Sequence, residues 1–199
     1  MDEGDRERWD RRWAAGEQGA GDSPDWLADL PDGLLPASGR ALDVASGSGA
    51  VALWLARRGL DVTAADVSPV GLERAARAAD EAGLSLQTRT VDLERESLPL
   101  PDTGDTGDTA AGTGWDVISC FHYLQRSLFP ALAAGLAPGG LLICEIATVR
   151  NLERNARPPA RFLLEEDELP GLCAPLEIAW FREGWHADRA VAQIVARKV

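Results

Sequence analysis

Two aspartates and two glycines near the start of the chain have the spacing of a nucleotide-type ligand site. Asp43 and Asp66 each end an apolar run, and Gly47 and Gly49 lie in a Gly/Ser loop after the first of them. Gly47, Gly49 and Ala52 satisfy a G-x-G-x-x-A pattern, and in dinucleotide folds an acid roughly 20 residues further on binds a ribose. The pattern therefore predicts a cofactor that contains a ribose.

The charge of Asp43 separates two kinds of cofactor. A pyrophosphate on the N-terminus of the following helix requires positive potential, and a carboxylate at the end of the adjoining strand opposes it. S-adenosylmethionine carries an ammonium and a sulfonium group without a phosphate, and it needs the glycine loop only for close backbone approach. Asp43 can hold the amino group of its methionine part through water. We therefore expect S-adenosylmethionine, with NAD as the alternative.

Apolar runs that alternate with helical patterns indicate the fold that positions these residues. Ser68 as N-cap and Pro69 at the first helical position predict a helix that ends at Gly83. A short polar link between the last two apolar runs favours an antiparallel hairpin. The sequence predicts an α/β fold with a Rossmann-like, doubly wound, mostly parallel sheet of about seven strands and a C-terminal antiparallel hairpin. The parallel strands are expected at residues 40–45, 60–67, 84–92, 115–121 and 141–147.

Length, charge and cysteine use limit the kind of protein. The length of 199 residues favours a single domain, expected at residues 38–199. The polar, Trp-bearing residues 1–37 are expected to form a leader or lid segment. The low-complexity segment at residues 102–114 is expected to be a surface loop. A net charge of −12 disfavours nucleic acid and anionic membranes as partners, and no apolar run approaches the ~20 residues of a membrane span. Three separated cysteines suit free thiols in a reducing cytoplasm and lack a zinc-site spacing. We expect a cytoplasmic monomer or homodimer without a metal.

Trp9 and Trp13 are four residues apart and share one face of a predicted leader helix. They either cover the cofactor pocket as a lid or form a packing face for the leader, and the spacing is compatible with both.

The region around the glycine loop resembles the class I S-adenosylmethionine-dependent methyltransferases, whose first motif reads acid-x-G-x-G-x-G after an apolar strand. Ala45 takes the place of the first glycine, and the rest of the motif is present. The resemblance extends over nearly the whole chain, with "TVDLE", "WDVISCFHYL" and "LAPGGLLICE" in the expected order. The motif residues here are Asp43, Val44, Ala45, Ser46, Gly47, Ser48 and Gly49.

This resemblance implies a role for each matching residue. Asp66 accepts hydrogen bonds from the ribose hydroxyls, and Val67 lies beside the adenine. Asp92 receives the adenine amino group, and Leu93 offers its backbone amide. Cys120 belongs to the strand that runs beneath the cofactor. The implied cofactor-binding residues are Asp43, Ala45, Gly47, Gly49, Asp66, Val67, Asp92, Leu93 and Cys120.

Within this family the chain is most similar to the small tellurite-resistance-type methyltransferases, on its Trp/Arg-bearing leader and the residues after the fourth strand. The implied acceptors are small oxyanions or other small nucleophiles, and the implied catalytic residues are His122, Arg126 and Arg182. His122 can orient a nucleophile or take its proton near neutral pH. A group of arginines either forms an anion-attracting rim or a solvated face paired with acids: Arg150, Arg154, Arg157 and Arg161.

The function predicted from the sequence is the transfer of a methyl group from S-adenosylmethionine to a small-molecule acceptor. Two alternatives remain at this point. One is an NAD-dependent oxidoreductase, which Asp43 disfavours. The other is a catalytically silent, cofactor-binding regulatory protein, because methyl transfer has no obligatory catalytic residue that the sequence can be searched for.

Overall fold

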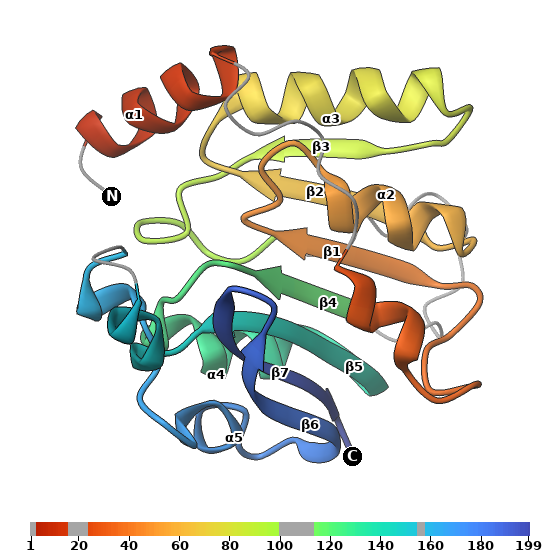
Figure 1. Cartoon of the computed structure of the whole chain (residues 1–199). Helices are drawn as coiled ribbons and strands as arrows, with labels where there is room; N and C mark the ends of the chain where they lie inside the picture. The colour runs from red at the N-terminus through yellow and green to blue at the C-terminus, as the bar shows by residue number, and fades with distance from the viewer. Residues whose placement is uncertain (1–2, 16–23, 100–113, 155–157) are drawn as a thin grey trace. The chain divides into compact units, whose positions relative to one another are not determined.

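The computed structural model describes residues 3–15, 24–99, 114–154 and 158–199 (Figure 1). The chain divides into two units, Met1–Pro101 and Asp102–Val199, which are described in turn. The low-complexity segment predicted as a surface loop lies, apart from Gly114, outside the described residues, as does Arg157. The predicted division into a leader and a single domain at residues 38–199 stays a prediction.

The first unit consists of three parallel strands with two helices between them in the chain, preceded by a leader helix and a short 3-10 helix. The strand order is β3-β2-β1. Asp43 lies opposite Ala64, and Asp66 lies opposite Thr90, so β1 and β2 end at the same edge. The elements are α1 (Glu3–Ala14), η1 (Asp25–Asp29), β1 (Arg40–Val44), α2 (Ala50–Arg57), β2 (Asp61–Asp66), α3 (Pro69–Glu81) and β3 (Gln87–Thr90).

The start of α3 follows the prediction. The Ser68 hydroxyl accepts a hydrogen bond from the amide of Gly71 at 3.2 Å, and Pro69 occupies the first helical position, where its missing N–H costs nothing. The helix ends just before Gly83, whose φ of 67° suits glycine. Local capping therefore fixes both ends of α3, and its N-terminus directly follows Asp66.

The second unit holds four strands in the order β4-β5-β7-β6. β4 and β5 are parallel, while β7 pairs antiparallel with both β5 and β6. The predicted C-terminal hairpin is therefore confirmed (Figure 1). The elements are β4 (Trp115–Phe121), η2 (Arg126–Leu128), α4 (Phe129–Gly135), β5 (Leu136–Ala147), η3 (Val149–Glu153), η4 (Ala160–Phe162), α5 (Glu168–Leu172), β6 (Glu177–His186) and β7 (Arg189–Arg197).

Seven strands with parallel and antiparallel pairs, alternating with helices, confirm the predicted α/β class. The largest difference from the predicted bounds is at β5, which begins at Leu136 instead of after the Pro-Gly-Gly turn, and β3 is shorter than the predicted 84–92. The pairing steps from Leu136 to Leu141 opposite Trp115 and Val117, so the turn is absorbed as an irregularity within the strand. Among the helices of the described residues, none has the length and apolar character needed to cross a membrane.

Candidate functional site

The glycine loop joins β1 to α2 in the first unit. Ala45, Gly47 and Gly49 have φ angles of 55°, 53° and 82°, in the left-handed region that glycine enters at little cost. The Gly49 amide donates to the carbonyl of Ser46 at 2.8 Å, which closes the turn before α2. The backbone therefore requires glycine at two positions, and Ala45 adopts the same region with a side chain.

Asp43 is buried at the end of β1, with 2% of its surface exposed. Its Oδ2 accepts a hydrogen bond from the amide of Ala52 in the first turn of α2 at 3.1 Å. A negative charge is favourable at a helix N-terminus, so Asp43 stabilises the start of α2. Its predicted contact with the ammonium group of the cofactor stays a prediction.

Asp66 holds two loops together at the end of β2. Its Oδ2 accepts from the amide of Gly47 at 2.9 Å, and its Oδ1 accepts from the amide of Ser68 at 2.8 Å. Burial raises the pKa of Asp66; hydrogen bonds from the amides of Ser68, Gly47 and Val67 oppose this shift, and the nearby Asp10 adds to it. The carboxylate is thus oriented by the backbone of the predicted cofactor loop.

The third predicted acid, Asp92, organises the turn after β3. Its Oδ1 accepts from the amide of Glu94 at 3.1 Å, and its own amide donates to Glu96 at 2.8 Å. Leu93 is buried, and Val67 is half-buried at the end of β2. The predicted adenine contacts of Val67, Asp92 and Leu93 stay predictions, as does that of Ala45.

The leader helix α1 packs on α3 (Figure 1), and the side chain of its Trp13 reaches the glycine loop. A methyl group built on Gly47 would lie 2.5 Å from the Trp13 ring, and one on Gly71 would lie 3.1 Å from it. The Arg74 guanidinium also donates to the Trp13 carbonyl. Trp13 is buried, with its indole ring seated against two glycines. The ring therefore contacts the loop that is predicted to bind the cofactor, and it also serves as packing.

In the second unit, His122 follows β4 with a φ of 58°. Its amide donates to the carbonyl of Glu145 at 2.8 Å. Its Nδ1 lies 3.6 Å from Glu145 Oε1 and 3.4 Å from Arg189 Nη2, while 43% of the side chain is exposed. Lost solvation lowers the pKa of His122, Arg189 lowers it further, and Glu145 opposes both. The imidazole is therefore accessible, and both the Glu145 carboxylate and the Arg189 guanidinium lie near its Nδ1.

Arg182 belongs to a polar row that crosses three strands. Its Nε donates to Gln193 Oε1 at 3.0 Å, and Gln193 Nε2 donates to Glu145 Oε2 at 2.7 Å. Strand register places Glu145 opposite Gln193, and Gln193 opposite Arg182. Glu145 and Gln193 are buried, with 6% and 0% exposed. The sequence reasoning missed both, although a polar residue within each of two apolar runs was the available signal.

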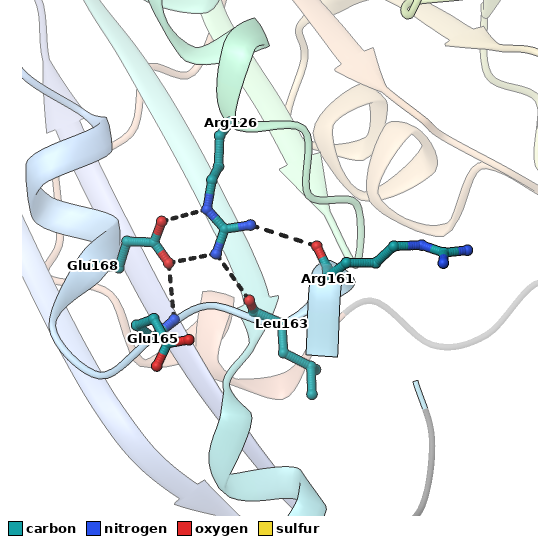
Figure 2. Close-up of polar contacts among 5 residues, drawn as sticks. All are labelled: Arg126, Arg161, Leu163, Glu165 and Glu168. Carbon is teal, nitrogen blue, oxygen red and sulfur yellow. Dashed lines mark hydrogen bonds and ion pairs between the residues drawn. The ribbon is translucent and has the colours of Figure 1, made fainter. Parts of the chain in front are cut away.

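Arg126 forms a bidentate ion pair with Glu168 (Figure 2). Its Nε lies 2.5 Å from Glu168 Oε1, and its Nη2 lies 2.7 Å from Oε2. Nη2 also donates to the carbonyl of Leu163 at 3.1 Å. The hydrogen bond from Arg126 lowers the pKa of Glu168, and the carboxylate raises that of Arg126. Arg126 thus connects η2 to the segment that leads into α5, and its predicted role at a substrate stays a prediction.

Cys120 lies buried in β4, and its thiol donates to the carbonyl of Tyr123 at 3.5 Å. Cys144 and Cys173 are also buried and free, and burial raises the pKa of Cys173 to about 12. Nowhere in the described chain are three His, Cys, Asp or Glu side chains grouped so as to hold a metal ion. The predicted cofactor contact of Cys120 stays a prediction.

Residues 41–140 match the family model described as a methyltransferase domain. The chain belongs to the methyltransferase domain family. The match begins in β1 and includes the glycine loop, Asp66 and Asp92. It confirms the predicted family of S-adenosylmethionine-dependent methyltransferases and favours it over the NAD-dependent alternative.

Comparisons with individual proteins agree with this assignment. The chain is 31% identical over 121 residues to a ubiquinone biosynthesis O-methyltransferase of Aeromonas salmonicida, covering 58% of this chain and 45% of the relative. The chain thus spans less than half the length of that curated relative.

Two solved structures share the fold. The crystal structure of TehB from Haemophilus influenzae matches with a TM-score of 0.70 and 18% identity, over 96% of this chain and 67% of that chain. The structure of magnesium protoporphyrin IX methyltransferase from Synechocystis with bound S-adenosylmethionine matches with a TM-score of 0.60 and 18% identity, over 98% of this chain and 80% of that chain. The predicted Rossmann-like architecture is therefore confirmed.

Proposed function

We propose that this methyltransferase transfers the methyl group of S-adenosylmethionine to a small-molecule acceptor. Asp66 and the glycine loop bind the cofactor, and His122 acts on the acceptor. The observation that carries the proposal is the buried Asp66 carboxylate, which the amides of Gly47 and Ser68 orient at the end of β2. When bound, S-adenosylmethionine supplies a methyl group activated by its sulfonium.

The residues of the first unit fit this cofactor. A carboxylate has about four acceptor positions, so Asp66 retains acceptor capacity for a ribose hydroxyl beside its backbone amides. Asp43 places negative charge beside the same loop, which suits an ammonium and opposes a phosphate. Asp92 and Leu93 would hold the adenine. Trp13, seated on Gly47, supports a role of the leader as a lid over this loop.

The acceptor is proposed from the second unit and from the relatives. A ubiquinone biosynthesis O-methyltransferase of partial similarity supports an oxygen nucleophile. His122, exposed and beside Glu145, is suited to take a proton from such a group. The anionic or oxyanion acceptor expected from the sequence remains part of the proposal, with Arg182 as a contact. Arg126 is the weaker candidate, because its guanidinium already binds Glu168 in two places.

The net charge of −12 and the three free buried cysteines support a cytoplasmic protein, monomer or homodimer, that acts on small molecules rather than on nucleic acid or membranes.

Calorimetry with S-adenosylmethionine, S-adenosylhomocysteine and NAD tests the cofactor. We expect both sulfur compounds to bind and NAD not to bind. Binding of NAD alone would overturn the proposal. Release of S-adenosylhomocysteine is then measured with a catechol, an aromatic thiol and tellurite as acceptors. Turnover of any of these supports the enzyme, and cofactor binding without turnover across a broad panel supports the silent regulatory alternative.

A further inference from the structure

The polar row of Glu145, Gln193 and Arg182 crosses β5, β7 and β6 and ends beside His122. Its hydrogen bonds hold Glu145 in place next to the imidazole. Glu145 Oε1 faces His122 Nδ1 at 3.6 Å, while Oε2 accepts from Gln193 at 2.7 Å. Gln193 is fully buried and is held in turn by Arg182. We propose that Glu145 is a positioning residue that orients His122 to accept the proton of a protic acceptor, namely a hydroxyl, thiol or amine. This inference rests on the proposed function.

The cost of burying Glu145 supports a role beyond packing. A carboxylate within an apolar strand is unfavourable unless its oxygens are paired. An apolar residue would suit this position, because Ile143 and Ala147, two residues away on the same face of β5, are buried. The row supplies one strong hydrogen bond from Gln193 and leaves the other oxygen facing His122. Two buried polar residues, Glu145 and Gln193, thus direct one carboxylate oxygen at the imidazole.

Two groups compete for the same nitrogen of His122. Arg189 is always a donor, so its contact with Nδ1 at 3.4 Å favours the tautomer that carries its proton on Nε2. Glu145 is an acceptor, so its approach to Nδ1 favours the tautomer with Nδ1–H, which leaves Nε2 as the basic nitrogen. Glu145 from β5 and Arg189 from β7 are the charged groups that act on the ring. The inference requires that Glu145 prevails over Arg189.

The proton and the electron pairs of the methyl transfer can all be accounted for. The acceptor X–H gives its proton to Nε2 of His122, and the electron pair on X forms the bond to the methyl carbon. S-adenosylmethionine, when bound, would supply this methyl carbon, and the electron pair of its carbon–sulfur bond would remain on the sulfur of S-adenosylhomocysteine, a neutral thioether. The imidazolium formed is stabilised by Glu145, and Arg189 favours the later loss of its proton. An acceptor without a transferable proton would not need this pair.

Nuclear magnetic resonance of the imidazole nitrogens in the full chain tests the inference without knowledge of the acceptor. The chain has two histidines, and a His186→Gln background leaves His122 as the single signal. We expect the neutral ring to carry its proton on Nδ1. We expect the pKa of His122 to fall in Glu145→Gln and to rise in Arg189→Gln. Glu183→Gln is the matched control, since that carboxylate contacts the amide of Asp167 instead, and it should change neither quantity.

A neutral ring protonated on Nε2, or a pKa of His122 that is the same in wild type and Glu145→Gln, would overturn the inference. Arg189 is exposed, so Arg189→Gln keeps the test decisive if the buried variant does not fold. Glu145 is then the remaining charged group at Nδ1, and a neutral ring protonated on Nε2 in Arg189→Gln would equally overturn the inference. Titration of S-adenosylhomocysteine into the same samples distinguishes a failure of the proposed function from a failure of the role of Glu145. If wild type does not bind S-adenosylhomocysteine, the proposed function is contradicted. If it binds but the pKa of His122 does not respond to Glu145→Gln, only the role of Glu145 is contradicted.

Discussion

Two buried carboxylates, Asp66 in the first unit and Glu145 in the second, are satisfied in different ways. Asp66 accepts hydrogen bonds from backbone amides, those of Gly47 and Ser68. Glu145 depends on side chains from other strands or strand ends: Gln193 donates a hydrogen bond to Oε2, and His122 Nδ1 lies 3.6 Å from Oε1. A backbone donor is present whatever residue supplies it, whereas a side-chain donor exists only if the partner has the right identity. Under the proposed function, the first arrangement would suit a fixed cofactor, and the second would allow acceptor chemistry to vary.

The comparison predicts the largest loss of stability at Glu145. Replacing it with Leu leaves the buried Gln193 amide without its acceptor, and we expect the free energy of unfolding to fall by roughly 2–3 kcal/mol. The double variant Glu145→Leu/Gln193→Leu should recover part of this loss, because both polar groups are then removed. Urea denaturation measures four proteins: wild type, Glu145→Leu, Gln193→Leu and the double variant. A double variant less stable than the sum of the single losses would contradict the pairing.

A smaller loss is expected at Asp66. In Asp66→Ala the amides of Gly47 and Ser68 lose their acceptor, but the space left by the smaller side chain can hold a water that replaces it. We expect the free energy of unfolding to fall by roughly 1–2 kcal/mol. Asp61→Ala, at the exposed opposite end of β2, is the matched control and should change little. A larger loss at Asp61 than at Asp66 would show that Asp66 does not hold the loops.

The Arg126–Glu168 pair lies nearer the surface, with side chains 41% and 21% exposed. Arg126→Lys loses the second contact of the planar guanidinium, and a cost of roughly 0.2–1 kcal/mol is expected. Because the pKa of Glu168 is lowered in the folded state, the stability that the pair contributes is present at neutral pH. It is lost as pH falls through the lowered pKa of Glu168. Stability curves of wild type and Arg126→Lys should therefore converge in acid, and a constant gap would contradict the ion pair.

The smallest change in the free energy of unfolding is expected at Ala45. This residue has a φ of 55° and stands where the first motif of the class I methyltransferases has glycine. Ala45→Gly relieves backbone strain and adds freedom to the unfolded chain, so a net gain of about 0–1 kcal/mol is expected. Ala41→Gly, at a buried alanine in the preceding strand β1, should instead destabilise the protein. Calorimetric unfolding of the two variants should give changes of opposite sign, and equal losses would show that Ala45 is not strained.

The first unit could be predicted closely because its determinants are local. Glycines at 47 and 49, the Ser68 cap and the strand periodicity all act within a few residues, and sequence patterns detect such signals. Asp66 was found by its place after the second apolar run. Its hydrogen bond to Gly47 joins residues 19 apart, yet both ends belong to recognisable motifs.

The second unit was less predictable because its contacts depend on register and distant segments. Glu145 and Gln193 are 48 residues apart and meet only because β5 and β7 align antiparallel. Arg126 suggested an anion site by its charge, but its partner Glu168 lies 42 residues further on, after several short elements. Neither pairing leaves a local pattern, so the sequence could indicate polar residues in these positions but not their partners.

The affinity for S-adenosylhomocysteine in Asp66→Ala and Glu145→Gln, measured side by side by calorimetry, tests the division between cofactor and acceptor residues most directly. Asp66→Ala should weaken binding by about 1.5–3 kcal/mol, the range for hydrogen bonds to a charged group. Glu145→Gln should bind as wild type does, because its carboxylate is assigned to the acceptor. Unchanged affinity in Asp66→Ala, or an equal loss in both variants, would contradict the account.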